Sequence, residues 1–202
     1  LTIQLKGEPV SRPYVDMTLQ MMTRCGIEIW QKKDGYQILP GSYLDTTLQI
    51  ERDWSSAAFF LLGAALSEQA ELRFEGLFHP SLQGDHRIMQ ILSEAGMSFR
   101  FDFAHATVIK PEGLILHFNS QYDFTDAPDL AVPFIVFCAL GSPQTTITGI
   151  RHLEWKESKR LTALIEELAK IGFELYYKND VLHFSHSIPD PTKCKPTSTP
   201  TG

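Results

Sequence analysis

One short segment of the chain concentrates side chains that could bind an anion. His152, Lys156, Glu157 and Arg160 lie close together in the sequence. Lys156 and Arg160 are four residues apart, so a helix would place them on one face. Two cations at the beginning of a helix oppose the helix dipole, and a bound anion would remove that conflict. The alternative is a solvated helix whose cations pair with Glu154 or Glu157, and such surface pairs contribute little stability.

A second segment, Asp123–Asp129, brings three carboxylates to the start of an apolar run. Asp129 directly precedes Leu130–Leu140, which predicts that it lies at the rim of a buried region. Loss of hydration raises the pKa of a carboxyl group and suits it to act as a general base. Helix capping together with solvated loop charge is the alternative explanation. The spacing of the carboxylates does not match the known calcium-binding loop.

A third segment, Ser11–Tyr14, can begin a helix, because serine suits the N-cap and Pro13 suits the first turn. Free amide groups and a hydroxyl at such a helix start could also hold a phosphate group. Simple capping is the alternative for this segment.

The string Gln83–Arg87 looks catalytic, but we interpret it as structural. Asp85 is expected near the start of an amphipathic helix, with Arg87 directed outward. Five histidines outside these segments lack metal-ligand spacing, and no role is expected for them. They are His79, His105, His117, His183 and His186.

Composition limits the class of protein. With 43% apolar and 21% charged residues among 202, the chain can bury a core, and wholesale disorder is excluded. A net charge of −6 without any basic block argues against a nucleic-acid partner. Three scattered cysteines indicate a reducing compartment, which we take to be the cytoplasm. The longest apolar runs, 57–66 and 130–140, are too short to span a membrane.

Three amphipathic helices are predicted to end at a glycine that is followed at once by an apolar residue. The pairs are Gly26–Ile27, Gly96–Met97 and Gly172–Phe173. Two short alternating runs follow each pair and predict a β-hairpin. The hairpins are expected at Ile27–Gln31 with Tyr36–Leu39, at Ser98–Phe103 with Ala106–Ile109, and at Glu174–Tyr177 with Val181–Phe184. This recurrence indicates a repeated unit.

Two further helices are almost entirely apolar, and each is followed by a strand. The helices are expected at Ser55–Leu66 and Pro128–Leu140, and the strands at Glu71–Phe74 and Thr145–Ile150. A helix that is apolar on all sides is buried, whereas the amphipathic helices show one face to water. The complete unit is therefore strand, buried helix, strand, amphipathic helix, strand, strand. We expect an α/β architecture with two complete units, 46–120 and 121–185, after a partial unit at 1–44.

Five strings in order along the chain resemble one family. They are Ser11–Leu19 (S-R-P-Y-x-D-x-T-L), Glu51–Ala57 (E-x-D-x-S-S-A), Gln83–Asp85 (Q-G-D), Pro128–Ala131 (P-D-x-A) and Lys156–Leu161 (K-E-S-x-R-L). Together they are similar to the EPSP synthases (3-phosphoshikimate 1-carboxyvinyltransferases), which are enolpyruvyl transferases. The resemblance extends from about residue 5 to residue 184.

The resemblance implies the enolpyruvyl-transferase fold, an α/β (α+β) fold in which two domains each contain three β-α-β-α-β-β units around buried helices. On this basis residues 1–45 form the last unit of the first domain and residues 46–186 form two units of the second. Residues 187–202 are expected to form an irregular tail. The fold would then be incomplete in this chain, and we expect the chain to be a piece of a longer protein.

Substrate-binding residues follow from the matched strings, position by position. By resemblance, Ser11, Tyr14 and Lys156 contact 3-phosphoshikimate. His152 stands where many members have asparagine, and a contact with the same substrate is expected there. Arg160 is expected to bind phosphoenolpyruvate.

Two carboxylates are expected, again by resemblance, to take part in proton transfer. Asp129 matches the catalytic carboxylate near the 5-hydroxyl of 3-phosphoshikimate, a substrate that it also binds. Glu157 matches the carboxylate implicated in proton transfer to the enolpyruvyl carbon. Lys159 replaces the aspartate that is usual in this string, which adds a cation and removes a carboxylate partner. The family's N-terminal lysine, C-terminal lysine and other phosphoenolpyruvate-binding arginines have no counterpart in this chain.

The resemblance implies transfer of the enolpyruvyl group of phosphoenolpyruvate to the 5-hydroxyl of 3-phosphoshikimate, a step of chorismate and aromatic amino-acid biosynthesis. No metal or organic cofactor is implied. The expected partners are the two small-molecule substrates, and the parent protein is expected to be a monomer. Two alternatives stay open: an enolpyruvyl transferase acting on UDP-N-acetylglucosamine, and a truncated non-catalytic domain. The chain alone is expected to be inactive, since it holds only part of the site.

Overall fold

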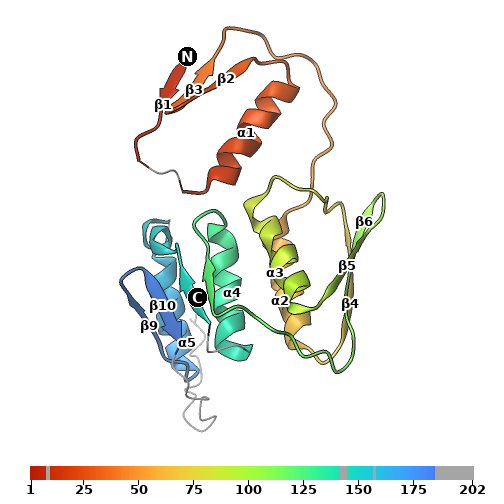
Figure 1. The fold of residues 1–202 in the computed structure, drawn as a ribbon, viewed down its shortest axis with the longest axis vertical. Coiled ribbons are helices and arrows are strands. Elements are labelled where there is room, and N and C mark those ends of the chain that lie inside the picture. The colour runs from red at the N-terminus through yellow and green to blue at the C-terminus, as the bar shows by residue number, and fades with distance from the viewer. Residues whose placement is uncertain (8–9, 142–144, 157, 185–202) are drawn as a thin grey trace, which may run out of the picture.

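The structure, a computed structural model, describes residues 1–7, 10–141, 145–156 and 158–184, in which helices and strands alternate and the strands form three sheets (Figure 1). The elements are β1 (Thr2–Gln4), α1 (Arg12–Arg24), β2 (Ile29–Lys32), β3 (Gly35–Ile38), α2 (Trp54–Leu66), β4 (Ala70–Glu75), the 3-10 helix η1 (Gly84–His86), α3 (Arg87–Ala95), β5 (Ser98–Phe101), β6 (His105–Lys110), β7 (Gln121–Asp123), α4 (Pro128–Gly141), β8 (Thr146–Thr148), the 3-10 helix η2 (Arg151–Trp155), α5 (Arg160–Lys170), β9 (Leu175–Lys178) and β10 (Val181–Phe184). The predicted tail lies outside the described residues.

One strand-helix-strand-strand topology occurs three times, as β1-α1-β2-β3, β4-α3-β5-β6 and β8-α5-β9-β10. In each case the last strand lies in the middle and pairs antiparallel with the other two. The strand orders are therefore β1-β3-β2, β4-β6-β5 and β8-β10-β9, and β7 adds a further strand beside β8. The three predicted hairpins and their repetition are confirmed.

The three amphipathic helices α1, α3 and α5 end in the same way. A glycine with positive φ follows each, and the next amide closes the helix by donating to a carbonyl five residues back. These bonds run from Ile27 to Met22, from Met97 to Leu92 and from Phe173 to Leu168. Each helix is thereby turned back into its hairpin, as the sequence predicts.

The strand predicted at the beginning of the second unit is not formed. Its counterpart in the third unit, β7, pairs in parallel with β8 and buries Tyr122. Residues 46–50 are instead largely exposed, and 73% of the Ile50 surface is accessible. Just after this segment, the amide of Arg52 donates to the carbonyl of Gly76, beyond the end of β4. Apolar strand residues need a packed neighbour, and no described part of the chain buries these residues.

The apolar helices α2 and α4 pack against each other at the centre, with the two later sheets on either side of them (Figure 1). In α4, Leu130, Phe134 and Ile135 are completely buried, as its sequence predicts. On α2 one side stays open, and Phe59 and Phe60 are exposed. In the described part of the chain, no helix is long and apolar enough to cross a membrane.

We expect Gly96→Ala to destabilise the fold and Gly63→Ala to stabilise it. Gly96 closes α3 with a φ of +119°, where a side chain costs about 1 kcal/mol or more. Gly63 lies on the exposed side of α2 with nothing within 4 Å of an added Cβ, so alanine gains about 0.5–1 kcal/mol of helix propensity. Thermal unfolding of the two variants measures both effects. Equal effects of the same sign would contradict the glycine-cap explanation.

Candidate active site

The first turns of α1, α2 and α4 lie together, and η1 fits between them. Ser11, just before α1, donates its amide to the carbonyl of Thr125, 3.0 Å away, in the loop that leads into α4. At Gly84 of η1, an added Cβ would lie 2.3 Å from the carbonyl of Asp126 and 3.4 Å from Pro13. Only glycine permits this approach, which explains the glycine of the Q-G-D string in packing terms.

Two polar side chains tie η1 and the preceding loop to the start of α2. Gln83 accepts from the amide of Trp54 at 2.9 Å and donates to the carbonyl of Arg52 at 2.8 Å. Glu51 accepts from the indole of Trp54 at 2.7 Å, from the amide of Phe78 at 3.0 Å and through its other oxygen from the hydroxyl of Ser81 at 2.7 Å. The first residues of the E-x-D and Q-G-D strings are thus structural clamps.

Asp129, in the first turn of α4, faces two cations. Its Oδ1 lies 2.7 Å from a guanidinium nitrogen of Arg160 and 3.7 Å from the Nζ of Lys156. The three side chains are each about one third exposed, at 36%, 34% and 31%. Asp129 therefore stands at the rim of the buried region, as predicted, and its carboxylate faces the two predicted anion-binding cations.

The sequence-based expectation that Lys156 and Arg160 share one helix face is wrong. Lys156 follows η2 in extended conformation, and α5 begins only at Arg160. They meet because Asp129, on another helix, accepts a hydrogen bond from Arg160 and lies within ion-pair distance of Lys156. Glu154, the alternative partner, accepts from the amide of Thr162 at 2.7 Å and from its hydroxyl, and so caps α5.

Tyr14 lies half-buried beside this cluster. Burial raises the pKa of Tyr14 to about 12, and the negative charges of Asp85 and Asp129 contribute to the rise, while the hydroxyl of Ser55 opposes it. Its phenol therefore stays protonated and available as a hydrogen-bond donor. Ser11 has a left-handed φ of 58° and its side chain makes no cap bond to α1, so the simple capping alternative is wrong for Ser11.

Asp85 lies just before α3, as the sequence predicts, but its burial beside the candidate site was not predicted. It is fully buried where the helix starts meet, and neither carboxyl oxygen has a hydrogen-bond partner among the described residues. Burial raises its pKa, the nearby hydroxyl of Ser55 lowers it, and the charge of Asp129 raises it again. Arg87 was expected to point outward, and that is wrong: it donates to the carbonyl of Asp123 and covers the ring of Phe124.

His152, on η2, completes the described cluster. Its Nε2 is buried and has no hydrogen-bond partner among the described residues. Burial lowers the pKa of His152, and the charge of Lys156 lowers it further, while Asp129 and Asp180 oppose the shift. The imidazole is therefore neutral at pH 7. Glu157 lies outside the described residues.

The structure thus brings Tyr14, His152, Lys156 and Arg160 together around Asp129. Ser11 joins this group through its backbone bond to the loop before α4. The signal for Asp85 was its place in the Q-G-D string, but local pattern alone does not show where that string packs. Among the described residues, no group of three or more His, Cys, Asp or Glu side chains is placed to hold a metal ion.

Comparison with known proteins gives one consistent result. The profile of the family EPSP synthase (3-phosphoshikimate 1-carboxyvinyltransferase) matches residues 2–199. The 3-phosphoshikimate 1-carboxyvinyltransferase of Bacteroides fragilis is 37% identical over 181 residues, which cover 89% of this chain and 44% of that protein. The protein of the same name from Methanothermobacter thermautotrophicus is 31% identical over 86% of this chain and 40% of its own length. The chain thus spans less than half the length of these relatives.

Solved structures support the same fold. EPSP synthase from Acinetobacter baumannii is similar with a TM-score of 0.62 and 24% identity, over 89% of this chain and 42% of that one. The enolpyruvyl transferase NikO from Streptomyces tendae is similar with a TM-score of 0.56 and 15% identity, over 91% and 42% of the two chains. The predicted enolpyruvyl-transferase fold is confirmed.

The pKa of His152 is expected to respond in opposite directions to its two charged neighbours. Lys156→Met removes the cation that lowers it, so the pKa rises but stays below the ordinary value, because burial remains the larger cause. Asp129→Asn removes the carboxylate that opposes the shift, so the pKa falls. NMR titration of the His152 ring protons measures both, with exposed His117 as the internal control. Shifts in the same direction would contradict the assigned surroundings.

Proposed function

The chain belongs to the EPSP synthase (3-phosphoshikimate 1-carboxyvinyltransferase) family, and we propose that its protein transfers the enolpyruvyl group of phosphoenolpyruvate to the 5-hydroxyl of 3-phosphoshikimate, with release of phosphate. The observation that carries the proposal is the convergence of Arg160 and Lys156 on Asp129. This arrangement provides cations for two anionic substrates and a carboxylate for a hydroxyl proton.

The reaction needs an acid, a base and fixed positive charge. A proton is added to the methylene carbon of phosphoenolpyruvate, and the 5-hydroxyl oxygen attacks the neighbouring carbon as the hydroxyl proton leaves. The resulting adduct then loses phosphate together with a methyl proton, which restores the double bond. Asp129 would take the hydroxyl proton, and Glu157 would supply and recover the carbon-bound proton.

The cations would hold the substrates in place for these steps. Arg160 presents its guanidinium at the start of α5, where it can bind the carboxylate or phosphate of phosphoenolpyruvate. Lys156 would contact 3-phosphoshikimate. Both now balance the charge of Asp129, so a bound substrate would compete with Asp129 for them.

The remaining contacts to 3-phosphoshikimate would come from neutral groups. The high pKa of Tyr14 keeps its hydroxyl protonated, so that it can donate a hydrogen bond. Ser11 directly precedes α1, the helix that carries Tyr14. Neutral His152 would offer its unpaired nitrogen in place of the asparagine amide found in many members. The closely related reaction on UDP-N-acetylglucosamine has no better support, and the relatives from Bacteroides fragilis and Methanothermobacter thermautotrophicus are both named 3-phosphoshikimate 1-carboxyvinyltransferase.

The site in this chain lacks the family's remaining phosphoenolpyruvate-binding cations, so we propose that the chain by itself does not turn over. We also propose that the whole protein acts in the cytoplasm as a monomer without metal or organic cofactor. The free Cys25 and buried Cys138 are consistent with a reducing compartment.

Asp129→Asn is expected to lower turnover by roughly 10²–10⁴-fold, because a general base is lost. Stability should change little, since partly exposed ion pairs contribute about 0–1 kcal/mol. Turnover and thermal unfolding are measured on the protein expressed from its complete reading frame. Asp16→Asn, at an exposed pair with Arg12, serves as the control and should change neither. Near-native turnover with a much lower melting temperature would reduce Asp129 to a structural role.

Arg160→Ala is expected to weaken phosphoenolpyruvate binding and leave 3-phosphoshikimate binding alone nearly unchanged. Lys156→Ala should weaken binding of 3-phosphoshikimate itself, because each variant removes a charged contact to one substrate. Calorimetric titration of each ligand into each variant separates the effects. Lys170→Ala, on the same helix α5 in a surface pair with Glu167, is the matched control. If the ligand affinities of both variants equal those of the Lys170→Ala control, Arg160 and Lys156 are solvated surface residues and the substrate-binding proposal is wrong.

A further inference from the structure

Two histidines outside the candidate site face each other at hydrogen-bond distance. Nδ1 of His79 lies 2.9 Å from Nε2 of His86. His79 belongs to the loop 76–83 that leads from β4 to η1, and His86 is the last residue of η1. The pair therefore links the middle of this loop to the element that carries Asp85.

The two rings meet edge to edge. Their centroids are 5.1 Å apart and their planes differ by 25°, so the centroid distance nearly equals the N–N distance plus the two ring radii. Each facing nitrogen thus points along the line between the rings, which suits one N–H and one lone pair. A metal ion shared by the two nitrogens would have to lie off the line that joins them, and both lone pairs would have to point toward that position. The arrangement fits a shared proton.

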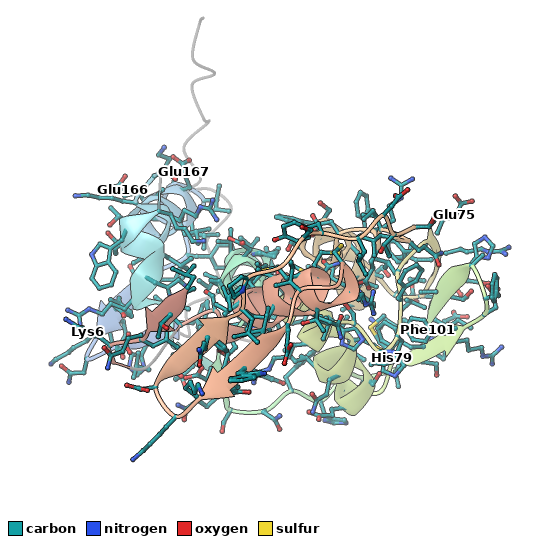
Figure 2. All side chains as sticks on the ribbon, turned by 90° about the horizontal axis from the view of Figure 1, so that it is seen from above. Lys6, Glu75, His79, Phe101, Glu166 and Glu167 are labelled. Atoms are coloured by element: carbon teal, nitrogen blue, oxygen red, sulfur yellow. The ribbon has the colours of Figure 1, made fainter. Side chains whose placement is uncertain are left out.

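Aromatic neighbours hold both rings in place. The ring of Trp54, which is fully buried, meets His86 edge-on at 4.8 Å. Phe101 lies nearly parallel to His79 at 5.0 Å, and Figure 2 shows these two side chains next to each other. Glu51 is the charged group that faces His86 from the segment before α2, and its oxygens are already occupied by Trp54, Phe78 and Ser81.

We propose that His79 and His86 form a proton-sharing latch that holds the loop 76–83 on η1 at neutral pH and releases it in acid. The neutral pair shares one proton between the facing nitrogens. One added proton binds an outer nitrogen and leaves the shared bond intact. A second added proton puts an N–H on both facing nitrogens and a positive charge on both rings, so the rings must separate.

The pKa of His86 is shifted in the direction that the latch requires. Burial lowers the pKa of His86, His79 lowers it further, and Glu51 opposes the shift. A group whose pKa is lower in the folded state than in the unfolded state stabilises the fold above its unfolded pKa, about 6.5 for histidine. That stability is lost as the pH falls through the folded value. The latch therefore opens on the acid side.

Opening of the latch would affect the candidate site, because the loop 76–83 is directly connected to residues that lie there. The same loop ends in Gln83, which clamps the start of α2, and continues directly into Gly84 and Asp85 between the helix starts. A loosened loop leaves these residues with fewer restraints. The latch itself does not depend on the proposed reaction, so each can fail without the other.

NMR titration of the histidine rings in the full chain tests the latch. In the unaltered protein we expect the pair to titrate in two steps separated by more than about one pH unit. In His79→Gln, His86 should titrate in one step at a higher pH than the lower step of the pair. His117→Gln, at an exposed histidine, is the control and should leave both steps unchanged. Identical titration of His86 with and without His79 would overturn the proposal.

A measurement on the unaltered protein keeps the test independent of how the variants fold. At about pH 8, well above the ordinary histidine pKa, a scalar coupling across the N–H···N bond should connect Nδ1 of His79 with Nε2 of His86. The coupling should disappear through the lower titration step, together with shifts of the Gln83 and Asp85 amide signals. Absence of the coupling at the higher pH, or amide signals that ignore the lower step, would rule the latch out.

Discussion

The amino ends of α1, α2 and α4 lie together, and the charge of their dipoles governs what can stand between them. A helix start carries partial positive charge and unpaired amides, so three of them in one place attract negative groups. Three aspartates lie in this region, and each has different surroundings. Asp53 accepts from the amides of Ser55 and Ser56 at the start of α2, Asp85 is buried as a carboxyl with a raised pKa, and Asp129 pairs with cations. An anionic substrate would enter a region already arranged for negative charge.

Close packing of these helix starts depends on the missing side chain of Gly84 as well as on the hydrogen bonds made by Glu51 and Gln83. A side chain at Gly84 would collide with the carbonyl of Asp126, so η1 could not lie between α1 and α4. The clamps from Glu51 and Gln83 then fix η1 against α2. Packing and electrostatics therefore act on the same few residues, and a change that relaxes one would disturb the other.

Local sequence pattern was sufficient to predict most helices and strands, but it was insufficient to predict the contacts between them. The glycine caps, the hairpins and the buried helices follow from residue type at short spacing, because cap geometry and helix period are local. The missing strand before α2, the inward turn of Arg87 and the burial of Asp85 depend on partners far away in the chain. Asp129 and Arg160 are 31 residues apart and lie on different helices. The resemblance to a family indicated most of the cluster, but not why Lys156 and Arg160 meet.

The repeated unit gives a physical reason for the way charge is distributed. Arg87 and Arg160 are the first residues of α3 and α5, which are equivalent helices of successive units. In the earlier unit, Arg87 donates to the carbonyl of Asp123 and so joins two units. In the later unit, Arg160 donates to the carboxylate of Asp129, a group that a substrate would replace under the proposed function. The two inner helices differ in parallel: Asp53 precedes α2 and is occupied by its own helix, whereas Asp129 stands inside the first turn of α4, after Pro128, and is free to face α5. One architecture thus supplies a structural arginine in one unit and a partly exposed ion pair in the next, and this ion pair lies where the helix dipoles favour an anion.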